Sequence, residues 1–147
     1  MSERKPIAIG LDVGTKTIGV AASDALGMMA HPLTTLRRKS VRADVDAIVL
    51  LAQKRASRTF VVGLPYELDG KERRSARLAR QIGDELAARG FEVHYVDERF
   101  STVDAEAALR EGGSSFERRA DIIDQAAAAV ILTRWLTQLR IAPLHDP

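Results

Sequence analysis

Three apolar segments with the alternation of β-strands open the chain. Residues 7–13 place large aliphatic side chains on one face and Asp12, their one charged residue, on the other. Residues 18–23 follow after a short turn and predict a second strand, so the pair is expected to form a hairpin. Residues 28–36 predict a third strand. Pro32 would confine that strand to a sheet edge because proline donates no ladder hydrogen bond.

The middle of the chain alternates between helical and strand patterns. Residues 41–57 carry apolar side chains at helical spacing and predict a helix. Residues 59–63 form a short, fully apolar strand, as expected in a parallel sheet that is covered on both faces. Residues 72–89 predict a second helix, and Gly90 is a suitable residue to end it. Residues 91–96 predict another strand.

The last third of the chain is expected to be helical. Residues 101–104 fit a capping box that opens a short helix, and residues 112–118 have a flexible composition. The final helix is predicted to begin at residue 119 or 121 and to end near residue 139. The whole order predicts an α/β fold with a five-stranded mixed sheet and helices on both faces. The length favours one domain spanning residues 1–147.

The composition excludes several kinds of functional site. The chain has no cysteine, which excludes disulfides, a thiolate nucleophile and cysteine-based metal sites. Its three histidines are scattered, and no nucleophile-elbow motif is present. No signal peptide or membrane-length apolar run is evident, so we expect a cytoplasmic protein with no membrane partner.

Positive charge is concentrated locally in a chain whose net charge is only +2. Basic residues, mostly arginine, cluster in residues 37–42, 71–80 and 118–119. The planar guanidinium fork of arginine binds two phosphate oxygens at once, so these clusters are candidates for phosphate recognition. A solvated helix face is the alternative for each cluster.

Carboxylates stand at three places where an apolar environment is predicted. Asp12 ends the first strand, Asp97 and Glu98 follow the last strand, and Asp124 adjoins a run of small apolar residues in the final helix. Burying a carboxylate costs several kcal/mol unless it is paired or binds a cation. Local alternatives exist: Asp12 would also suit an Asx-turn, and only one of the two acids after the last strand is expected to face a site. Asp121 would suit a helix N-cap or first turn.

Three carboxylates without clustered histidine or cysteine favour a hard cation, Mg²⁺ or Mn²⁺. Together with the arginine clusters, they indicate phosphoryl transfer or phosphodiester hydrolysis, in which two such ions can act together.

Four sequence blocks resemble the YqgF/RuvX family over about residues 7–136. They are residues 10–20 (GLDVGTKTIGV), residues 62–65 (VGLP) with Asp69-Gly70, residues 97–102 (DERFST), and Asp124 with the apolar run after it. The resemblance implies a ribonuclease H-like fold related to RuvC-type Holliday junction resolvases. It also implies a cytoplasmic nuclease that processes the 5′ end of precursor 16S ribosomal RNA.

Matching residue by residue, the resemblance implies that the catalytic and metal-binding acids are Asp12, Glu98 and Asp124, which favours Glu98 over Asp97. It further implies two Mg²⁺ or Mn²⁺ ions, and hydrolysis that leaves a 3′-hydroxyl and a 5′-phosphate. The segment before Asp124 departs from the family pattern and contains Asp121, which would be either a fourth ligand or a cap.

Several residues are candidates for substrate contact. Phe116 would stack on an unpaired base or fold back on the core. The basic candidates are Lys16, Arg73, Arg74, Arg77, Arg118 and Arg119.

Other readings remain open at this point. A Holliday junction resolvase would use the same acids on branched DNA, and symmetric cleavage would require a homodimer rather than a monomer. A non-catalytic nucleic-acid-binding assembly factor is a further alternative. The motif at Asp12 also resembles the phosphate loop of sugar kinases and actin-like ATPases, but those proteins need two such domains around a nucleotide.

Overall fold

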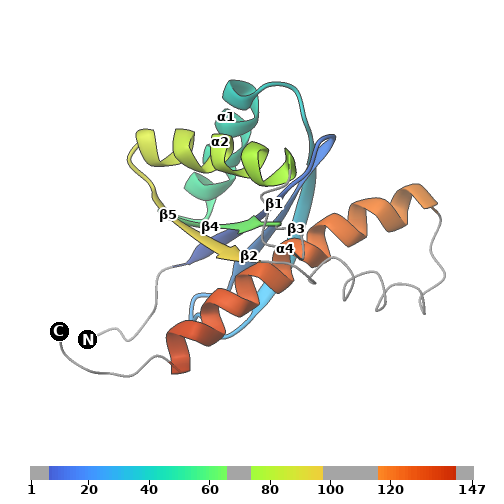
Figure 1. The fold of residues 1–147 in the computed structure, drawn as a ribbon. Coiled ribbons are helices and arrows are strands. Elements are labelled where there is room, and N and C mark those ends of the chain that lie inside the picture. Colours follow the sequence, from blue (N-terminus) through green and yellow to red (C-terminus); the bar gives the residue numbers. More distant parts are fainter. Residues whose placement is uncertain (1–6, 66–73, 98–115, 142–147) are drawn as a thin grey trace.

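A computed structural model describes residues 7–65, 74–97 and 116–141 and shows a sheet with helices on both sides (Figure 1). The strands are β1 (Ala8–Val13), β2 (Thr17–Ser23), β3 (Ala30–Arg37), β4 (Thr59–Leu64) and β5 (Glu92–Asp97). The described helices are α1 (Val41–Lys54), α2 (Arg74–Ala88) and α4 (Phe116–Ile141).

The five strands form one mixed sheet in the order β3-β2-β1-β4-β5. β1, β2 and β3 pair antiparallel, whereas β4 lies parallel to both β1 and β5. The predicted hairpin, mixed sheet and edge position of the strand containing Pro32 are therefore confirmed. Every residue of β4 is buried, as its uniformly apolar sequence predicted.

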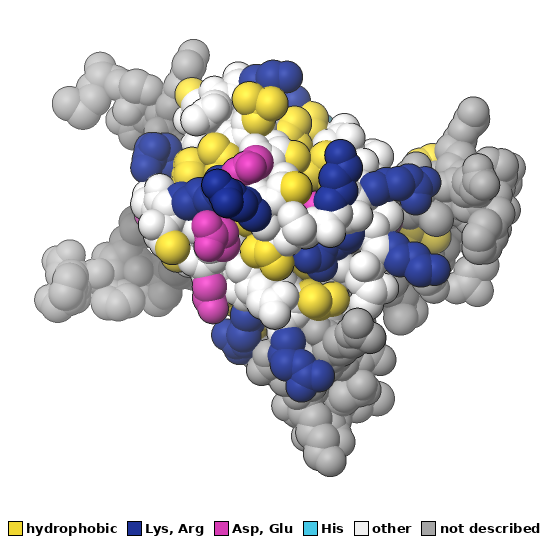
Figure 2. Space-filling model, turned by 90° about the horizontal axis from the view of Figure 1, so that it is seen from above, with side chains coloured by type: hydrophobic (Ala, Val, Ile, Leu, Met, Phe, Trp, Pro, Cys, Tyr) yellow, Lys and Arg dark blue, Asp and Glu magenta, His cyan; other side chains and the backbone are white. Residues whose placement is uncertain are grey.

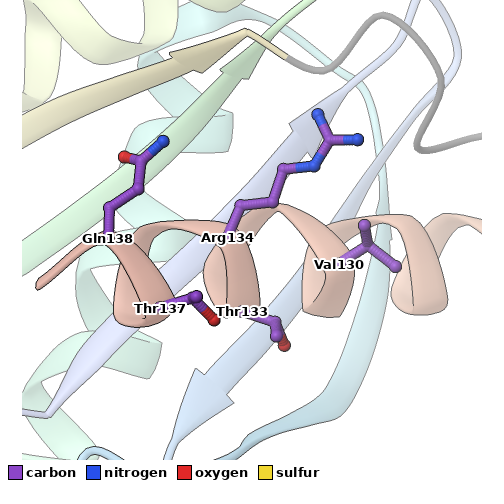
Figure 3. Close-up of a pocket in the computed structure, with 5 residues that line it drawn as sticks. All are labelled: Val130, Thr133, Arg134, Thr137 and Gln138. Carbon is purple, nitrogen blue, oxygen red and sulfur yellow. The ribbon is translucent and has the colours of Figure 1, made fainter. Parts of the chain in front are cut away.

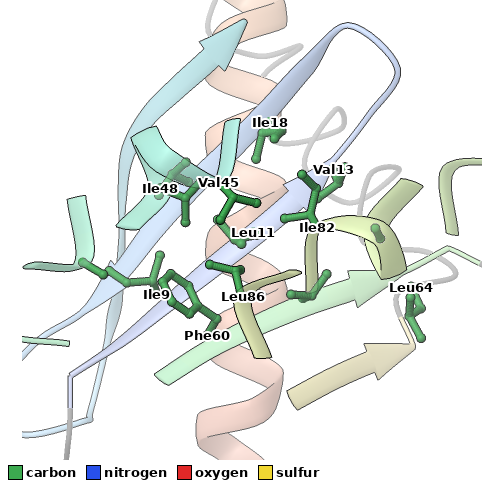
Figure 4. Close-up of a cluster of buried hydrophobic side chains, with 14 of the residues drawn as sticks. Ile9, Leu11, Val13, Ile18, Val45, Ile48, Phe60, Leu64, Ile82 and Leu86 are labelled. Atoms are coloured by element: carbon green, nitrogen blue, oxygen red, sulfur yellow. The ribbon is translucent and has the colours of Figure 1, made fainter. Parts of the chain in front are cut away.

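Helices α1 and α2 cover one face of the sheet. Side chains from β1, β2 and β4 that point to this face meet the apolar sides of both helices in the larger of two cores (Figure 4). Phe60 on β4 is the largest fully buried side chain among the described residues, and it meets Phe91 edge to face with ring centroids 5.3 Å apart.

Helix α4 alone covers the opposite face among the described helices (Figure 1). Small residues let it lie close to the sheet. A Cβ atom at Gly10 of β1 would stand 2.8 Å from the carbonyl oxygen of Ala128 and 2.9 Å from Cβ of Leu132. Ala128 and Leu132 are fully buried in the second core, which this helix forms with alternate residues of the strands.

The last helix starts earlier than the sequence predicted. Residues 116–118 were expected to belong to a flexible segment, but α4 already begins at Phe116. Glutamate, arginine and alanine in residues 117–120 have high helix propensity, which outweighs the influence of the glycines and serines before them. Asp121 consequently lies beyond the first turn and is not the N-cap of this helix. The short helix expected after residues 101–104 falls outside the described residues.

The start of α1 and the end of α2 are each explained by a single residue. Ser40 caps α1 by accepting a hydrogen bond from the backbone N–H of Ala43 at 3.1 Å. Gly90 follows α2 with φ of +93°, the left-handed conformation that glycine adopts most readily. None of the described helices combines the length and the apolar character that crossing a bilayer requires.

Candidate functional site

The predicted acids belong to one edge of the sheet. β1, β4 and β5 run parallel, so their carboxyl ends meet at the same edge, where open α/β sheets gather their functional groups. Asp12, which is partly buried, lies near the end of β1, and Asp97 is the exposed last residue of β5. Glu98 follows Asp97 directly but lies outside the described residues.

Asp12 stands on the α4 face of the sheet. Its neighbours Leu11 and Val13 point into the core beneath α1 and α2, so the alternation of the strand directs Asp12 to the other face. Directly opposite Asp12 in the antiparallel ladder is Gly19 of β2. Paired residues in such a ladder project to the same face, so Gly19 also faces α4.

Gly19 is a point of close approach between α4 and the hairpin. A Cβ atom at Gly19 would overlap the backbone carbonyl of Asp124. Only a hydrogen atom therefore fits between β2 and the helix at this position. Because Gly19 is paired with Asp12, this close approach brings the helix position of Asp124 over the ladder position of Asp12. The backbone of Asp124 thus lies against the ladder partner of Asp12, although the two acids are far apart in the sequence.

Thr17 fixes the side chain of Asp124. Its hydroxyl group donates a hydrogen bond of 2.6 Å to Oδ2 of Asp124. Thr17 starts β2, two residues before Gly19, and therefore lies on the same face of the strand. Sequence reasoning missed this residue because a threonine in a turn is common; its spacing of two from Gly19 was the available signal.

The turn between Asp12 and Thr17 is held by Arg38. The Arg38 guanidinium donates to the carbonyl of Gly14 at 3.0 Å, and the Arg38 backbone N–H donates to the carbonyl of Lys16 at 2.9 Å. The same guanidinium pairs with buried Asp44 at 2.9 Å. Arg38 was grouped with the candidate phosphate-binding arginines, but its charge is already paired and it supports the turn.

The basic candidates fall on different sides of the sheet. Lys16 is exposed in the turn after Asp12. Arg74 and the exposed Arg77 belong to α2, on the face opposite α4, whereas Arg118 and Arg119 lie in the first turn of α4. The elements that carry the described candidates therefore lie in different parts of the fold. Arg73 lies outside the described residues, and nothing is described of the side chains of Arg74, Arg118 and Arg119.

The donor atoms at this place suit a hard cation. Asp12 and Asp124 contribute carboxylate oxygens, and Thr17 occupies one oxygen of Asp124 as a hydrogen-bond donor. Within the residues that the structure describes, no group of three or more potential ligands is assembled. The third predicted acid, Glu98, would have to join from the end of β5, beyond these residues.

A separate hollow lies farther along α4, on its outward side (Figure 3). It has a volume of about 400 Å³ and is lined by Val130, Thr133, Arg134, Thr137 and Gln138. Arg134 reaches from this helix to the carbonyl oxygen of Asp97 at 2.9 Å and so ties α4 to the end of β5. Among the described residues, the lining of this hollow contains no carboxylate or imidazole, so we assign the hollow no chemistry.

Comparison with known proteins decides the family. Residues 6–138 match the RuvX family, which is described as Holliday junction resolvase. The chain belongs to the RuvX family. Relatives named "Putative pre-16S rRNA nuclease" include one from Myxococcus xanthus, 46% identical over 87% of this chain and 85% of the relative. Another, from Paracoccus denitrificans, is 47% identical over 89% of this chain and 84% of the relative.

Solved structures agree on the fold of this RuvX member. T. thermophilus RuvC in complex with a Holliday junction substrate superposes with a TM-score of 0.55 at 18% identity, over 94% of this chain and 97% of that one. Fowlpox virus resolvase, also solved with junction DNA, superposes with a TM-score of 0.55 at 9% identity, over 90% of this chain and 98% of that one. The predicted ribonuclease H-like fold is confirmed. Both names given to the family and its relatives denote nucleases, so this RuvX chain is a nuclease by membership.

Proposed function

We propose that this RuvX chain hydrolyses phosphodiester bonds in precursor 16S ribosomal RNA, at the 5′ end of that RNA. A hydrolytic site is supported by the position of Asp124, whose backbone lies against Gly19, the ladder partner of Asp12, and whose carboxylate is held by Thr17. The names of the relatives support the choice of ribosomal RNA as substrate. The location would then be the cytoplasm, where ribosomes are assembled.

Asp12, Glu98 and Asp124 are proposed to hold Mg²⁺ or Mn²⁺. A divalent cation bound there would act as a Lewis acid on the scissile phosphate and would favour ionisation of the attacking water. The chain's own residues provide the placement: Asp12 is fixed by the β1 ladder, and Asp124 is fixed by its helix and by Thr17. This rigid support matters because a displacement of about 1 Å can lower a rate about a hundredfold.

Branched DNA is the second candidate substrate. The RuvX family is described as Holliday junction resolvase, and the fold is shared with RuvC bound to a junction. The acids do not distinguish RNA from DNA, because both present the same phosphodiester. Resolution of a four-way junction requires two symmetric cuts and hence a homodimer, whereas trimming of an RNA end is possible for a monomer.

The deciding experiment offers both substrates to the same preparation. A labelled 5′ segment of precursor 16S RNA and a labelled four-way DNA junction are incubated with Mg²⁺, with Mn²⁺ and with EDTA. We expect cleavage of the RNA alone, abolished by EDTA, with 3′-hydroxyl and 5′-phosphate ends. Cleavage of the junction alone by a dimeric species would establish the resolvase instead. If neither is cut by folded protein, a nucleic-acid-binding assembly factor becomes the better account.

Removal of the Thr17 hydroxyl is expected to weaken the site without unfolding the protein. Thr17→Val keeps the side-chain volume but leaves Oδ2 of Asp124 without this donor, and should lower both Mn²⁺ affinity and cleavage about tenfold. Thr17→Ser retains a hydroxyl and should restore most of both. Isothermal titration with Mn²⁺ measures the affinity independently of activity. Equal Mn²⁺ affinities in the wild type and both variants would show that Thr17 does not position Asp124.

A further inference from the structure

Exposed basic side chains border the hairpin end at which Asp12 and Asp124 meet. We propose that Lys16, Arg37, Lys39 and Arg42, together called the hairpin-edge surface, bind the sugar–phosphate backbone of the nucleic acid as it leaves the acids. This inference rests on the proposed nuclease function and assigns a further part of the same substrate path. The sequence contains the basic cluster of residues 37–42 but does not show where this cluster lies relative to the acids.

The sheet register makes that connection. Arg37, the last residue of β3, is paired directly with Thr17 of β2. Paired residues share a face and have Cβ atoms roughly 4.5–5.5 Å apart. Thr17 in turn donates its hydroxyl to Asp124. Arg37 therefore lies on the α4 face of the sheet, next to the residue that binds the carboxylate of Asp124. A phosphate next to the scissile one would lie within the reach of such a side chain.

The four basic residues also differ from other arginines in their partners. Arg38 is paired with Asp44, and Arg89 with Asp46 and Glu85. In contrast, within the described part of the chain no carboxylate forms an ion pair with any of the four residues of the hairpin-edge surface. Each of the four is exposed. A group of like charges without counterions fits a polyanionic partner.

Arg42 adds an electrostatic cost that a bound phosphate would offset. It lies in the first turn of α1, immediately after the Ser40 cap, where the helix dipole favours negative charge. A cation there opposes the dipole by a few tenths of a kcal/mol or more. Phosphate bound nearby would be attracted by both Arg42 and the helix end.

Two of the four residues also border a hollow. A hollow of about 330 Å³ lies between β3 and α1, and Arg37 and Lys39 are among the residues that line it. The carboxylate in its wall, Asp44, is already bound by the Arg38 guanidinium and the backbone N–H of Lys39. Figure 2 shows acidic side chains gathered on the left of the face that carries α1 and α2, whereas basic side chains continue over the right.

A matched pair of double variants tests the inference. Arg37→Gln/Lys39→Gln removes two charges from the hairpin-edge surface. Lys54→Gln/Arg55→Gln removes two exposed charges from the other end of α1 and changes the net charge equally. Affinity for the fluorescent precursor 16S RNA segment is measured by anisotropy in EDTA, which prevents cleavage, over a series of salt concentrations. Thermal melts confirm that both variants are folded.

We expect the hairpin-edge variant to bind about tenfold or more weakly, with the slope of log affinity against log salt smaller by about 1.4–1.8. The control variant should keep the wild-type slope. A wild-type slope in the hairpin-edge variant, or equal losses in both variants, would overturn the inference while leaving the proposed function intact. Wild-type protein that neither binds nor cleaves the RNA would overturn both.

Discussion

Replacement of Asp12 by asparagine is expected to reduce phosphodiester cleavage by about a thousandfold or more in Mg²⁺, which corresponds to about 4 kcal/mol of transition-state stabilisation. The amide has nearly the shape of the carboxylate, so the β1 ladder and the close packing around Gly19 should survive. What is lost is the negative charge at the end of the strand, which the proposed site would use to hold a divalent cation. Single-turnover cleavage rates measure the loss, and far-UV circular dichroism checks the fold.

The acids after β5 provide a matched control for this experiment. Glu98→Gln should match the loss seen at Asp12, because the family resemblance places Glu98 in the same site. Asp97→Asn alters the neighbouring carboxylate and should retain most of the activity, since its residue is exposed at the strand end. Wild-type rates in a folded Asp12→Asn variant would remove Asp12 from the site. Loss at Asp97 but not at Glu98 would reverse the assignment of these two residues.

Strands were the most predictable part of this molecule. The alternation in residues 7–13 and the fully apolar residues 59–63 each follow from burial on one or both faces of a sheet, which is a local constraint. The hairpin connections place β1, β2 and β3 side by side, but the crossover through α1 does not by itself determine that β4 adds next to β1. Helix ends were less predictable. Helix α4 begins at Phe116 because the residues after it have high helix propensity, whereas the glycines and serines before it predict a loop.

The site could be predicted only in part, because its geometry depends on long-range packing. The apolar surroundings predicted for Asp12 and Asp124 indicated a functional role for each acid. The family resemblance assigned both acids to one site. The reason that they meet lies in Gly19, whose missing side chain lets α4 touch β2. A glycine in a strand has many causes, so the sequence alone did not connect it with an acid far along the chain.

The role of a charged residue could not be predicted from the sequence where the fold brings its partner close to it. Arg38 belonged to an apparent phosphate-binding cluster, but Asp44 neutralises it and the turn carbonyl of Gly14 takes another of its donors. Its neighbour Arg37 points to the opposite face of the sheet and has no such partner within the described residues. Adjacent arginines at the end of a strand can therefore have separate roles, one structural and one available to a ligand.

Gly19→Ala should damage stability and activity together, which makes it the strongest test of how the site is assembled. The added methyl group would overlap the backbone carbonyl of Asp124, and a helix backbone cannot rotate away as a flexible side chain can. Overpacking of this kind costs about 1–3 kcal/mol, so thermal unfolding should occur several degrees lower. Because α4 must move away from β2, Asp124 would leave its place over Asp12 and lose the Thr17 hydrogen bond. We expect cleavage to fall about a hundredfold.

Gly90→Ala separates the two effects. Gly90 has φ of +93° at the end of α2, and the nearest atom to an added Cβ there would be an arginine nitrogen at 3.9 Å. Alanine at this position is strained without any overlap, so it should destabilise the protein by about 1 kcal/mol. Its cleavage rate per folded molecule should stay at the wild-type value, because α2 lies on the other face of the sheet from Asp124. A Gly19→Ala variant that melts and cleaves like Gly90→Ala would mean that the acids tolerate displacement of α4. A hundredfold difference between the two would show that the closeness of helix and hairpin is itself a requirement of the reaction.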